Sequence, residues 1–422
     1  MKRMREDNML NIKPLTEDNA IDIASLMLNA YPAIGYNRTP EQYVELLKEN
    51  NNRDDVNEYG VYDHEQLVGG FNVWDFDMNV RNIMIQAAGI GSVAVDLCRK
   101  KEKIALHIMR HFIHSQRERG RNITLLYAFN SAFYHKMGYG FGTLLQQFRL
   151  RPTALPSEES KKYIIRLMEA DASELVAYYN EKVTHTHGLI QKAEHEFATR
   201  LKNPAVKIYG YRRDGVISGY MACTFKKGSD ESFLVNDLIV NEMFFDSPDV
   251  YIELMTFLKS QADQVRYVIL NTFDEGLIHT ITDPRNQTER ILYSVYQEVC
   301  QSGLGIMYRI TDVRGFFEDI RECRFGDLTM SVRLTVRDSI VEENHRSFGL
   351  RFDKGFCTVD DAGDMDMELV IDIAELSSLL MGCANVKQLV KYGKAHVSDV
   401  TRLEELSRGL YLDEKPVCVT HF

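Results

Sequence analysis

The chain of 422 residues lacks several features that mark common classes of protein. Its seven cysteines include no CxxC pair, which predicts reduced thiols in a cytoplasmic protein and not a disulfide framework. No stretch approaches the roughly 20 apolar residues of a membrane helix. We also expect no signal peptide, because no apolar segment follows the charged residues near the first methionine. These absences predict a cytoplasmic protein with no membrane span.

An excess of positive charge is missing as well. The chain has 50 Lys and Arg against 61 Asp and Glu, a net charge of −11, which argues against non-specific binding of nucleic acid. GxSxG and Walker sequences are absent, and the GxG of "GIGSVAV" has no third glycine, so a dinucleotide site is not expected. The best metal candidate is the helical series His107, His111 and His114, but no acidic or cysteine ligand completes it, and His185 with His187 is weaker. We expect no metal.

The length predicts more than one domain, because single cores stop growing near 250 to 300 residues. We expect three: residues 1–152, 160–302 and 305–422, with the linker "RPTALPSEESKK" after the first. The second region repeats the first, since its hairpin 209–225 is followed by a strand, a helix and a strand in the same order. The fold class is therefore α/β (α+β), with two related domains and a smaller third one.

The first region shows clear changes of hydrophobic period. Residues 16–32 and 39–50 read as helices with Thr16 and Thr39 as N-caps, and 59–78 as a hairpin around "DHEQ". Four further elements follow: a strand over 88–95, an amphipathic helix over 103–120, a strand over 122–129 and a short helix near 131–140. The third region alternates apolar and polar residues over 327–361, as half-buried antiparallel strands do, and then becomes helical.

A basic turn joins the strand ending at Val95 to the long helix. It holds Arg99, Lys100, Lys101 and Lys103, and the helix begins at once. Backbone N–H groups at a helix start together with cations form an anion site that suits a pyrophosphate. On charge alone, a solvated basic turn explains the sequence equally well.

Tyr134 stands near the start of the short helix "SAFYHKMG". A phenol in that place can donate a proton to a leaving group. Because Phe133 and Met137 flank it, a core position is the better explanation of this tyrosine when it is taken alone.

The order of these elements is more specific than any one of them. A hairpin, a strand ending in "VAV", a basic turn, a helix, the strand "LLYA" and "FYHKMGYG" together resemble the acetyl-CoA-binding region of GNAT N-acetyltransferases. A second GNAT-like region, a third region similar to sterol carrier proteins and a C-terminal phenylalanine extend the likeness over essentially the whole chain. "GLGIMYRITDVRGFFEDI" also matches the segment at the entry to the third domain. The chain resembles the enhanced intracellular survival (Eis) family.

This resemblance implies acetyl transfer from acetyl-CoA to an amine. Backbone groups of Val93, Ala94 and Val95 would bind the pantetheine arm. The turn would bind the pyrophosphate through Lys101, Glu102, Lys103, Ile104, Ala105 and Leu106. Phe129 and Asn130 would lie beside the thiol end. Tyr134 matches the family's general acid, and the carboxylate of Phe422 matches its general base.

The turn departs from the family in one respect. Lys103 stands where glycine is usual, and Glu102 adds a negative charge, which together predict weaker cofactor binding. The equivalent turn of the second region, "NEMFFDSPDV", has no basic cluster and should not bind CoA.

The end of the chain, "KPVCVTHF", is apolar, which predicts a packed terminus. Tyr31, Tyr36, Trp74 and His421 are candidates for the acceptor pocket. The resemblance suggests aminoglycosides, polyamines or lysine-bearing peptides as acceptors, and a homo-oligomer that in relatives is a hexamer. Few acidic residues lie near Tyr31, which weighs against highly charged aminoglycosides.

A rival hypothesis comes from a different class. The protein would bind an apolar ligand in its third domain without being an enzyme, and the GNAT regions would be scaffold. Lys103 at the glycine position is the best support for this alternative.

Overall fold

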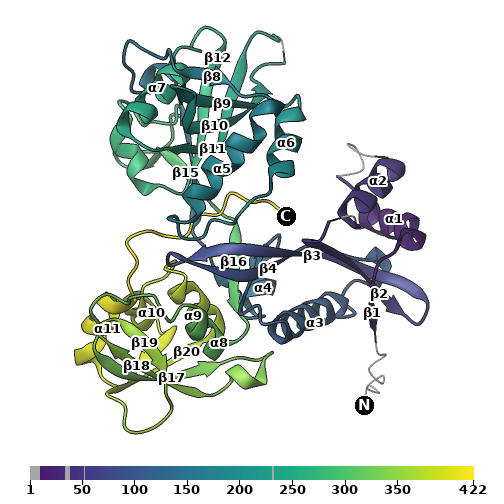
Figure 1. Ribbon diagram of the computed structural model, residues 1–422, viewed down its shortest axis with the longest axis vertical. Helices are drawn as coiled ribbons and strands as arrows, with labels where there is room; N and C mark the ends of the chain where they lie inside the picture. Colours follow the sequence, from purple (N-terminus) through teal and green to yellow (C-terminus); the bar gives the residue numbers. More distant parts are fainter. Residues whose placement is uncertain (1–9, 34–38, 52, 231) are drawn as a thin grey trace. The chain divides into compact units, whose positions relative to one another are not determined.

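The computed structural model describes residues 10–33, 39–51, 53–230 and 232–422. It divides into two compact units. The first consists of Met1–Gly142, Ile306–Pro416 and Thr420–Phe422, and the second of Thr143–Gly305 and Val417–Val419. Figure 1 shows the elements of both units, and each unit is described by itself below.

The first unit contains a seven-stranded sheet in the order β1-β2-β3-β4-β5-β16-β6. All neighbours are antiparallel except β4 and β5, which are parallel. The strands are β1 (Asn11–Pro14), β2 (Val56–Asp63), β3 (Gln66–Val80), β4 (Ile83–Val95), β5 (Ile123–Tyr127), β16 (Ile306–Ile310) and β6 (Gly140–Phe141). The predicted hairpin around "DHEQ" is confirmed as β2 and β3.

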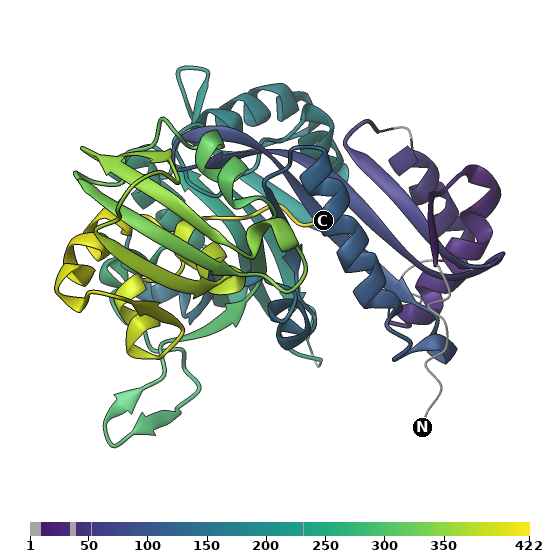
Figure 2. The same cartoon turned by 90° about the horizontal axis from the view of Figure 1, so that it is seen from below.

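Helices cover both faces of this sheet. They are α1 (Ala20–Ala30), α2 (Pro40–Asn51), α3 (Ile104–Glu118) and α4 (Ser131–His135). A Cβ added at Gly70 would meet Ile23 and Met27 of α1, whereas one at Gly69 would meet Ile104 of α3, so α1 and α3 pack on opposite faces. Figure 2 shows α3 lying along the sheet.

The predicted caps of α1 and α2 have different outcomes. Thr39 caps α2, because its Oγ1 accepts a hydrogen bond from Gln42 N–H at 3.3 Å and Gln42 Oε1 accepts one from Thr39 N–H at 2.9 Å. Thr16 does not cap α1. A 3₁₀ turn over Glu17–Asn19 comes first, α1 begins only at Ala20, and the Thr16 hydroxyl bonds Asn19 at 3.1 Å.

A five-stranded sheet in the order β19-β18-β17-β20-β21 completes the first unit. Its strands are β17 (Met330–Arg337), β18 (Ser347–Asp353), β19 (Phe356–Val359), β20 (Met367–Asp372) and β21 (Ala395–Val397). Its helices are α8 (Val313–Asp319), α9 (Ile373–Leu380), α10 (Val386–Lys391) and α11 (Leu403–Leu410). The alternation predicted for 327–361 is confirmed, since β17 has the burial pattern of a half-buried strand.

A buried ion pair joins this smaller sheet to the first one. Arg309 of β16 donates two hydrogen bonds to Asp338, at 2.9 and 2.7 Å, and a third to the carbonyl of Met137 at 2.6 Å. Both charged side chains are fully buried. Arg309 therefore ties the segment after α4 to the entry of the third region, which explains why an arginine stands in the segment "MYRI".

The second unit repeats the first sheet. Its order is β8-β9-β10-β11-β12-β7-β15, and only β11 and β12 are parallel. The strands are β7 (Leu144–Leu150), β8 (Ile164–Arg166), β9 (Val206–Arg213), β10 (Val216–Lys227), β11 (Asn236–Phe245), β12 (Val265–Thr272) and β15 (Cys300–Leu304). The helices are α5 (Ala172–Val183), α6 (Glu194–Lys202) and α7 (Pro248–Lys259). The predicted repeat of the first region is confirmed.

The sixth strand of each sheet comes from a distant part of the chain. β7 follows the first sheet in sequence but pairs with β12, and β16 follows the second sheet but pairs with β5. The expected range 1–152 thus includes a strand of the second sheet. The domain ranges given above remain a prediction, because strand exchange leaves no single cut in the chain.

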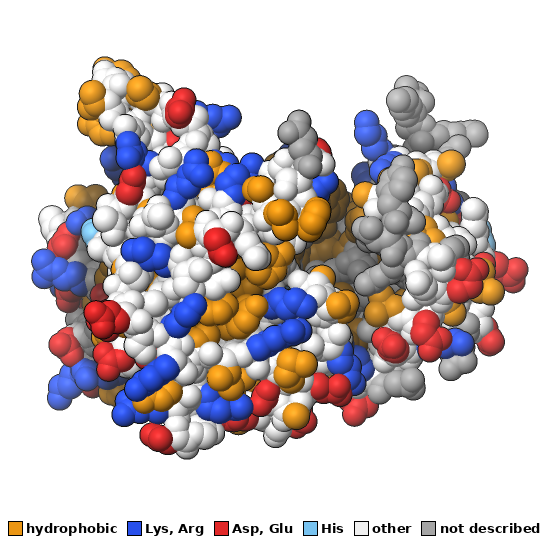
Figure 3. Space-filling view, turned by 90° about the horizontal axis from the view of Figure 1, so that it is seen from above, with side chains coloured by type: hydrophobic (Ala, Val, Ile, Leu, Met, Phe, Trp, Pro, Cys, Tyr) orange, Lys and Arg blue, Asp and Glu red, His pale blue; other side chains and the backbone are white. Residues whose placement is uncertain are grey.

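A small hairpin of the second unit is markedly apolar. β13 (Ile291–Tyr293) pairs with β14 (Tyr296–Gln297), and five of its side chains are 62 to 84% exposed: Ile291, Leu292, Tyr293, Val295 and Tyr296. Figure 2 shows this green hairpin projecting, and a projecting tip in the space-filling view of Figure 3 carries hydrophobic side chains.

Candidate active site

The parallel strands β4 and β5 separate soon after they meet. Only Ala87–Gly89 pair with Ile123–Leu125, and β4 then continues to Val95 paired with β3 alone. The edge of β4 that faces β5 is therefore free over its last six residues, 90–95. An extended ligand can add to such an edge through main-chain hydrogen bonds. The divergence forms the centre of the candidate site.

A bulge shapes this free part of β4. Asn72 pairs with Gly91 and Gly70 with Ala94, so two residues of β4 face one of β3, and Ser92 has a positive φ of 51°. Ala94 is buried, while Val93 and Val95 are partly exposed. The three residues expected to bind pantetheine thus lie together on the diverging edge. The Val93 carbonyl already accepts a hydrogen bond from the Tyr31 hydroxyl at 2.7 Å.

The basic turn leads directly into α3. Lys101 has a φ of 70° and Lys103 a φ of 65°, so both adopt the left-handed conformation that favours glycine. Lys103 is the N-cap residue of α3, and its side chain makes no cap hydrogen bond. The N–H groups of Ile104, Ala105 and Leu106 are among those that an α-helix leaves without intrahelical partners. The turn keeps the conformation of a glycine turn while it adds two cations.

Two charges of the turn are already paired. Arg99 donates to Glu102 at 2.6 Å and to Asp63 at 2.7 Å, which places the Glu102 charge beside a guanidinium. The repulsion expected between Glu102 and a bound phosphate is therefore reduced. Lys100, Lys101 and Lys103 remain as the cations of this turn for an anion.

Tyr134 lies in α4, next to the divergence. Asn130 caps this helix by accepting a hydrogen bond from Phe133 N–H at 3.2 Å. Tyr134 is 3% exposed, and its ring meets those of Phe129, Phe133 and Tyr139 edge-on. Burial, then the nearby hydroxyls of Tyr31 and Tyr139, raise the pKa of Tyr134 well above its ordinary value. The phenol stays protonated at neutral pH, as a proton donor must.

The last residue of the chain lies on the same sheet. The ring of Phe422 packs against Trp74, Phe76 and Tyr127 at centroid distances of 5.6, 5.0 and 5.3 Å. The Tyr127 hydroxyl donates to the carbonyl of Thr420 at 2.8 Å. Strands β3 and β5 therefore hold the terminus from both sides, and the predicted packing of the chain end is found in these contacts.

Glycines make room for this terminus. A Cβ at Gly89 would lie 2.5 Å from the Phe422 ring, and one at Gly91 would lie 3.1 Å from its terminal oxygen. A side chain at Gly89 would displace the Phe422 ring, and one at Gly91 would press on Trp74 and on the terminal oxygen. The carboxylate thus lies over β4 where pairing with β5 has just ended.

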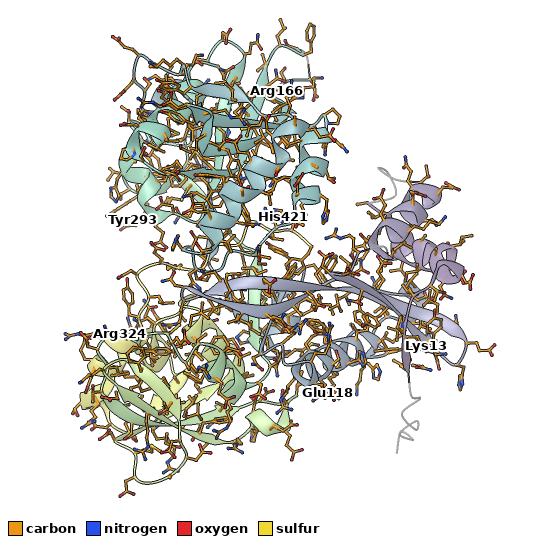
Figure 4. All side chains as sticks on the ribbon, viewed as in Figure 1. Lys13, Glu118, Arg166, Tyr293, Arg324 and His421 are labelled. Atoms are coloured by element: carbon orange, nitrogen blue, oxygen red, sulfur yellow. The ribbon has the colours of Figure 1, made fainter. Side chains whose placement is uncertain are left out.

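The four candidates for the acceptor pocket have different places. Trp74 contacts Phe422, and the His421 ring packs on Tyr127 at 5.5 Å; Figure 4 labels His421 near the chain end. Tyr31 lies against Val93. Tyr36 lies outside the described residues. Phe129 is 78% exposed beyond the end of β5.

Sequence reasoning missed Tyr127, the two glycines and Glu58. Glu58 of β2 is 3% exposed. In "VNEYG" it is in phase with the buried Val56, and that apolar phase is the signal that would have identified it. Burial, opposed by a hydrogen bond from Asn50, raises the pKa of this carboxyl to about 7.

A separate pocket of about 610 Å³ lies in the first unit. Its charged or imidazole side chains are His135, Lys136, Arg337, Asp372, Glu375, Lys394 and His396. Glu375 contacts His135 at 3.3 Å and Lys394 at 3.7 Å. The hydrogen bond to Glu375 raises the pKa of His135. Over the described ranges there is no group of three His, Cys, Asp or Glu side chains placed to hold a metal, and no helix is long and apolar enough to cross a bilayer.

Three family models match the chain. An acetyltransferase (GNAT) domain matches residues 11–142, a second acetyltransferase (GNAT) domain matches 188–310, and a sterol carrier protein domain matches 313–419. A comparison with curated proteins found no match.

Solved structures share the whole fold. A GCN5-related N-acetyltransferase from Anabaena variabilis has a TM-score of 0.81 at 15% identity, covering 98% of this chain and 100% of that one. A second GCN5-related N-acetyltransferase, from Kribbella flavida, has a TM-score of 0.77 at 18% sequence identity and covers 98% of each chain. Eis1 from Mycobacterium abscessus has a TM-score of 0.76 at 16% sequence identity, covering 98% of this chain and 100% of that one.

These matches agree with the sheets and helices described above. Two GNAT domains followed by a sterol carrier protein domain make up nearly all of the chain. The chain is a GNAT acetyltransferase with two GNAT domains and a sterol carrier protein domain, and it shares the fold of Eis1 from Mycobacterium abscessus.

Proposed function

We propose that this acetyltransferase moves an acetyl group from acetyl-CoA to a primary amine, of aminoglycoside, polyamine or lysine type, by direct attack of the amine on the thioester. One observation carries the proposal. The terminal residue Phe422 is packed over Gly89 and Gly91 at the point where β4 and β5 diverge. Phe422 is partly buried there, and the position of its carboxylate at this divergence favours a role in catalysis.

The donor fits the diverging strands. Acetyl-CoA carries a pyrophosphate, which the N–H groups at the start of α3 and the lysines of the turn suit by charge and direction. The free edge of β4 offers Val93, Ala94 and Val95 to the pantetheine arm. Phe129 and Asn130 would lie at the thiol end.

Two groups have opposite proton roles in this proposal. An alkyl ammonium has a pKa of about 10 and must lose a proton before it attacks, and the Phe422 carboxylate accepts that proton. Tyr134 gives its proton to the departing thiolate. Main-chain N–H groups near the bulge of β4 polarise the thioester carbonyl.

The test follows free CoA thiol and acetylated amine together. The purified chain is mixed with acetyl-CoA and a panel of primary amines of different charge. We expect one acetylated amine for each thiol released. Thiol release without acetylated amine, or no turnover across the panel, contradicts the proposal.

The rival function in the third domain has one observation to examine, the pocket of about 610 Å³. Its lining carries seven charged or imidazole side chains, which suits an apolar ligand poorly. Thermal stabilisation by a fatty acid or sterol, with none by acetyl-CoA, would favour the rival.

Self-association and cytoplasmic location remain predictions. The exposed apolar hairpin β13–β14 supports a homo-oligomer, because apolar tips of this kind are commonly covered in assemblies. Light scattering on the full chain gives the number of copies, for which the resemblance suggests six.

A further inference from the structure

Glu58 belongs to a polar row that crosses three strands. Glu58 of β2 pairs with Asn72 of β3, and Asn72 pairs with Gly91 of β4. Directly opposed residues of antiparallel strands point to the same face. Trp74 lies two residues from Asn72 and contacts Phe422, and Gly91 lies under the terminal oxygen. Glu58, Asn72 and the terminal carboxylate therefore share one face of the sheet.

One oxygen of Glu58 is held and the other is not. Oε1 accepts from the amide of Asn50 at 2.9 Å and from that of Asn72 at 3.4 Å. Oε2 is buried and has no hydrogen-bond partner among the described residues. No ion pair to Glu58 is found within the same ranges. A buried carboxyl oxygen without a partner is costly and calls for an explanation.

The geometry sets the distance between the two acidic groups. Adjacent strands lie about 4.8 Å apart, so Glu58 and Gly91 are separated by roughly 10 Å across β3. Asn72 stands between them in register, and its amide donates to Glu58 Oε1 at 3.4 Å. Two nitrogens joined by four carbons span about 6 Å, since bond lengths are near 1.5 Å. A short diamine has the right scale.

We propose that Glu58 is a second acidic subsite of the acceptor pocket, where Oε2 binds a second ammonium group of an acceptor whose first nitrogen is acetylated beside Phe422. The preferred acceptors are then short diamines or polyamines. This inference rests on the proposed acetyl transfer, and it names the charge that the region around Tyr31 lacks. Asn50 and Asn72 orient the carboxyl without neutralising it.

The alternative explanation is a purely structural Glu58 that links α2 to β3. The amide bonds to Asn50 and Asn72 would then be its whole role, and Glu58 would be protonated in the folded protein. Such a residue would affect stability but not the choice between acceptors. The two explanations differ in one measurable ratio.

The experiment compares kcat/KM for 1,4-diaminobutane and for butylamine in the wild type and in Glu58→Gln. Both amines have the same carbon chain, so their ratio isolates the second nitrogen. We expect a preference for the diamine that falls roughly tenfold or more in Glu58→Gln, with butylamine turnover retained. Glu65→Gln, at the exposed turn between β2 and β3, removes the same charge and should leave the ratio unchanged.

The outcomes separate the two proposals. If neither amine is acetylated by the wild type, the proposed function fails. If both are acetylated and the ratio is equal in wild type and Glu58→Gln, the acetyl transfer stands and the subsite is wrong. If Glu58→Gln unfolds, the wild type still decides, because a diamine preference below about twofold overturns the subsite.

Discussion

The two GNAT sheets have the same strand order, yet their buried glutamates have opposite surroundings. Glu58 of the first sheet has only amide partners, and its pKa is raised to about 7. Glu242 of the second sheet contacts Arg200 at 3.1 Å and Lys192 at 3.6 Å, and it accepts a hydrogen bond from Tyr220. Burial acts against ionisation there, but the two cations hold the pKa of Glu242 below its ordinary value.

The helices after the fourth strand differ in the same way. In the first sheet, α3 begins at Ile104, and its N-cap residue Lys103 makes no side-chain cap hydrogen bond. In the second, Ser247 caps α7 by accepting from Val250 N–H at 3.4 Å, and Pro248 follows it. The preceding Asp246 binds Lys182 at 2.7 Å. That the second turn does not bind CoA remains a prediction, and the capped start with a paired Asp246 gives a physical reason for it.

The difference shows how one fold can serve two purposes. The second unit pairs its buried glutamate with two cations and caps the start of α7 with Ser247, which stabilises it. The first leaves the start of α3 uncapped and a glutamate oxygen without a described partner, whereas the strand edge beyond the parallel pairing is free in both sheets, over 90–95 of β4 and 241–245 of β11. Unsatisfied polar groups of this kind cost stability and gather at functional sites.

We expect the largest loss of activity from changing Tyr134, because we propose no general acid in the second unit. Tyr134→Phe should lower kcat by about 10² to 10⁴, because the proton for the departing thiolate is lost. The acetyl-CoA Kd should change little. Tyr293→Phe, on the exposed hairpin, is the control and should have wild-type kcat. An unchanged kcat in Tyr134→Phe would remove the acid from the account.

The two buried glutamates should respond oppositely to the same substitution. Glu242→Gln leaves Lys192 and Arg200 without their carboxylate and should destabilise the fold by about 3 to 5 kcal/mol at pH 7. Glu58→Gln should instead stabilise it at high pH. Denaturant unfolding of both variants measures the contrast.

The pH dependence of the Glu58 effect has a definite sign. The pKa of Glu58 is raised in the folded protein, so ionising Glu58 lowers stability. This loss is absent below the unfolded pKa of about 4.5 and grows as the pH rises to about 7. Glu58→Gln should therefore gain up to about 3 kcal/mol over wild type between pH 4 and pH 8. A constant difference across this range would contradict the raised pKa.

Positive charge should matter for the donor in the turn before α3 and not at exposed positions on the second sheet. The double change Lys101→Glu and Lys103→Glu should weaken acetyl-CoA binding roughly tenfold or more, because anionic side chains would face the pyrophosphate. The matched double change Lys226→Glu and Lys227→Glu, at exposed positions in the second unit, should leave it unchanged. Titration calorimetry at two salt concentrations measures both, and equal effects would place the donor site elsewhere.

The smallest effect concerns the conformation of Lys103. At a φ of 65°, Lys103→Gly should relieve left-handed strain and stabilise the fold by up to about 1 kcal/mol. Lys100→Gly, at a φ of −61°, should give no such gain. If both variants are equally destabilised, the turn is not strained.

Much of the fold could be predicted from the sequence, for physical reasons that particular elements show. The period of 59–78 identified β2 and β3, and the repeat at 209–225 identified the second sheet. The exchange of β7 and β16 could not be predicted, because which partner an apolar strand pairs with depends on contacts far along the chain. The 3₁₀ turn over Glu17–Asn19 before α1 could not be predicted for a similar reason, since Thr16 is a good N-cap in composition alone.

The candidate site was only partly visible in the sequence. Tyr134 and Phe422 came from the family resemblance, and their roles remain predictions. Phe422 packs against Gly89, Gly91 and Tyr127, yet in the sequence each of these residues looks like an ordinary strand residue. From the sequence, Lys103 in place of glycine predicts weaker cofactor binding, whereas the backbone there keeps the left-handed conformation of a glycine. Glu58 needed three-dimensional register before its relation to Asn72 and Gly91 could be seen.

The central claim is that the carboxylate of Phe422 acts in acetyl transfer. The most direct measurement converts this single group to a carboxamide by joining a synthetic C-terminal peptide, which keeps the ring and its contacts with Trp74, Phe76 and Tyr127. The account predicts that kcat falls about a hundredfold or more while the acetyl-CoA Kd and the thermal stability stay unchanged. A carboxamide protein that turns over amines at the wild-type rate would contradict it.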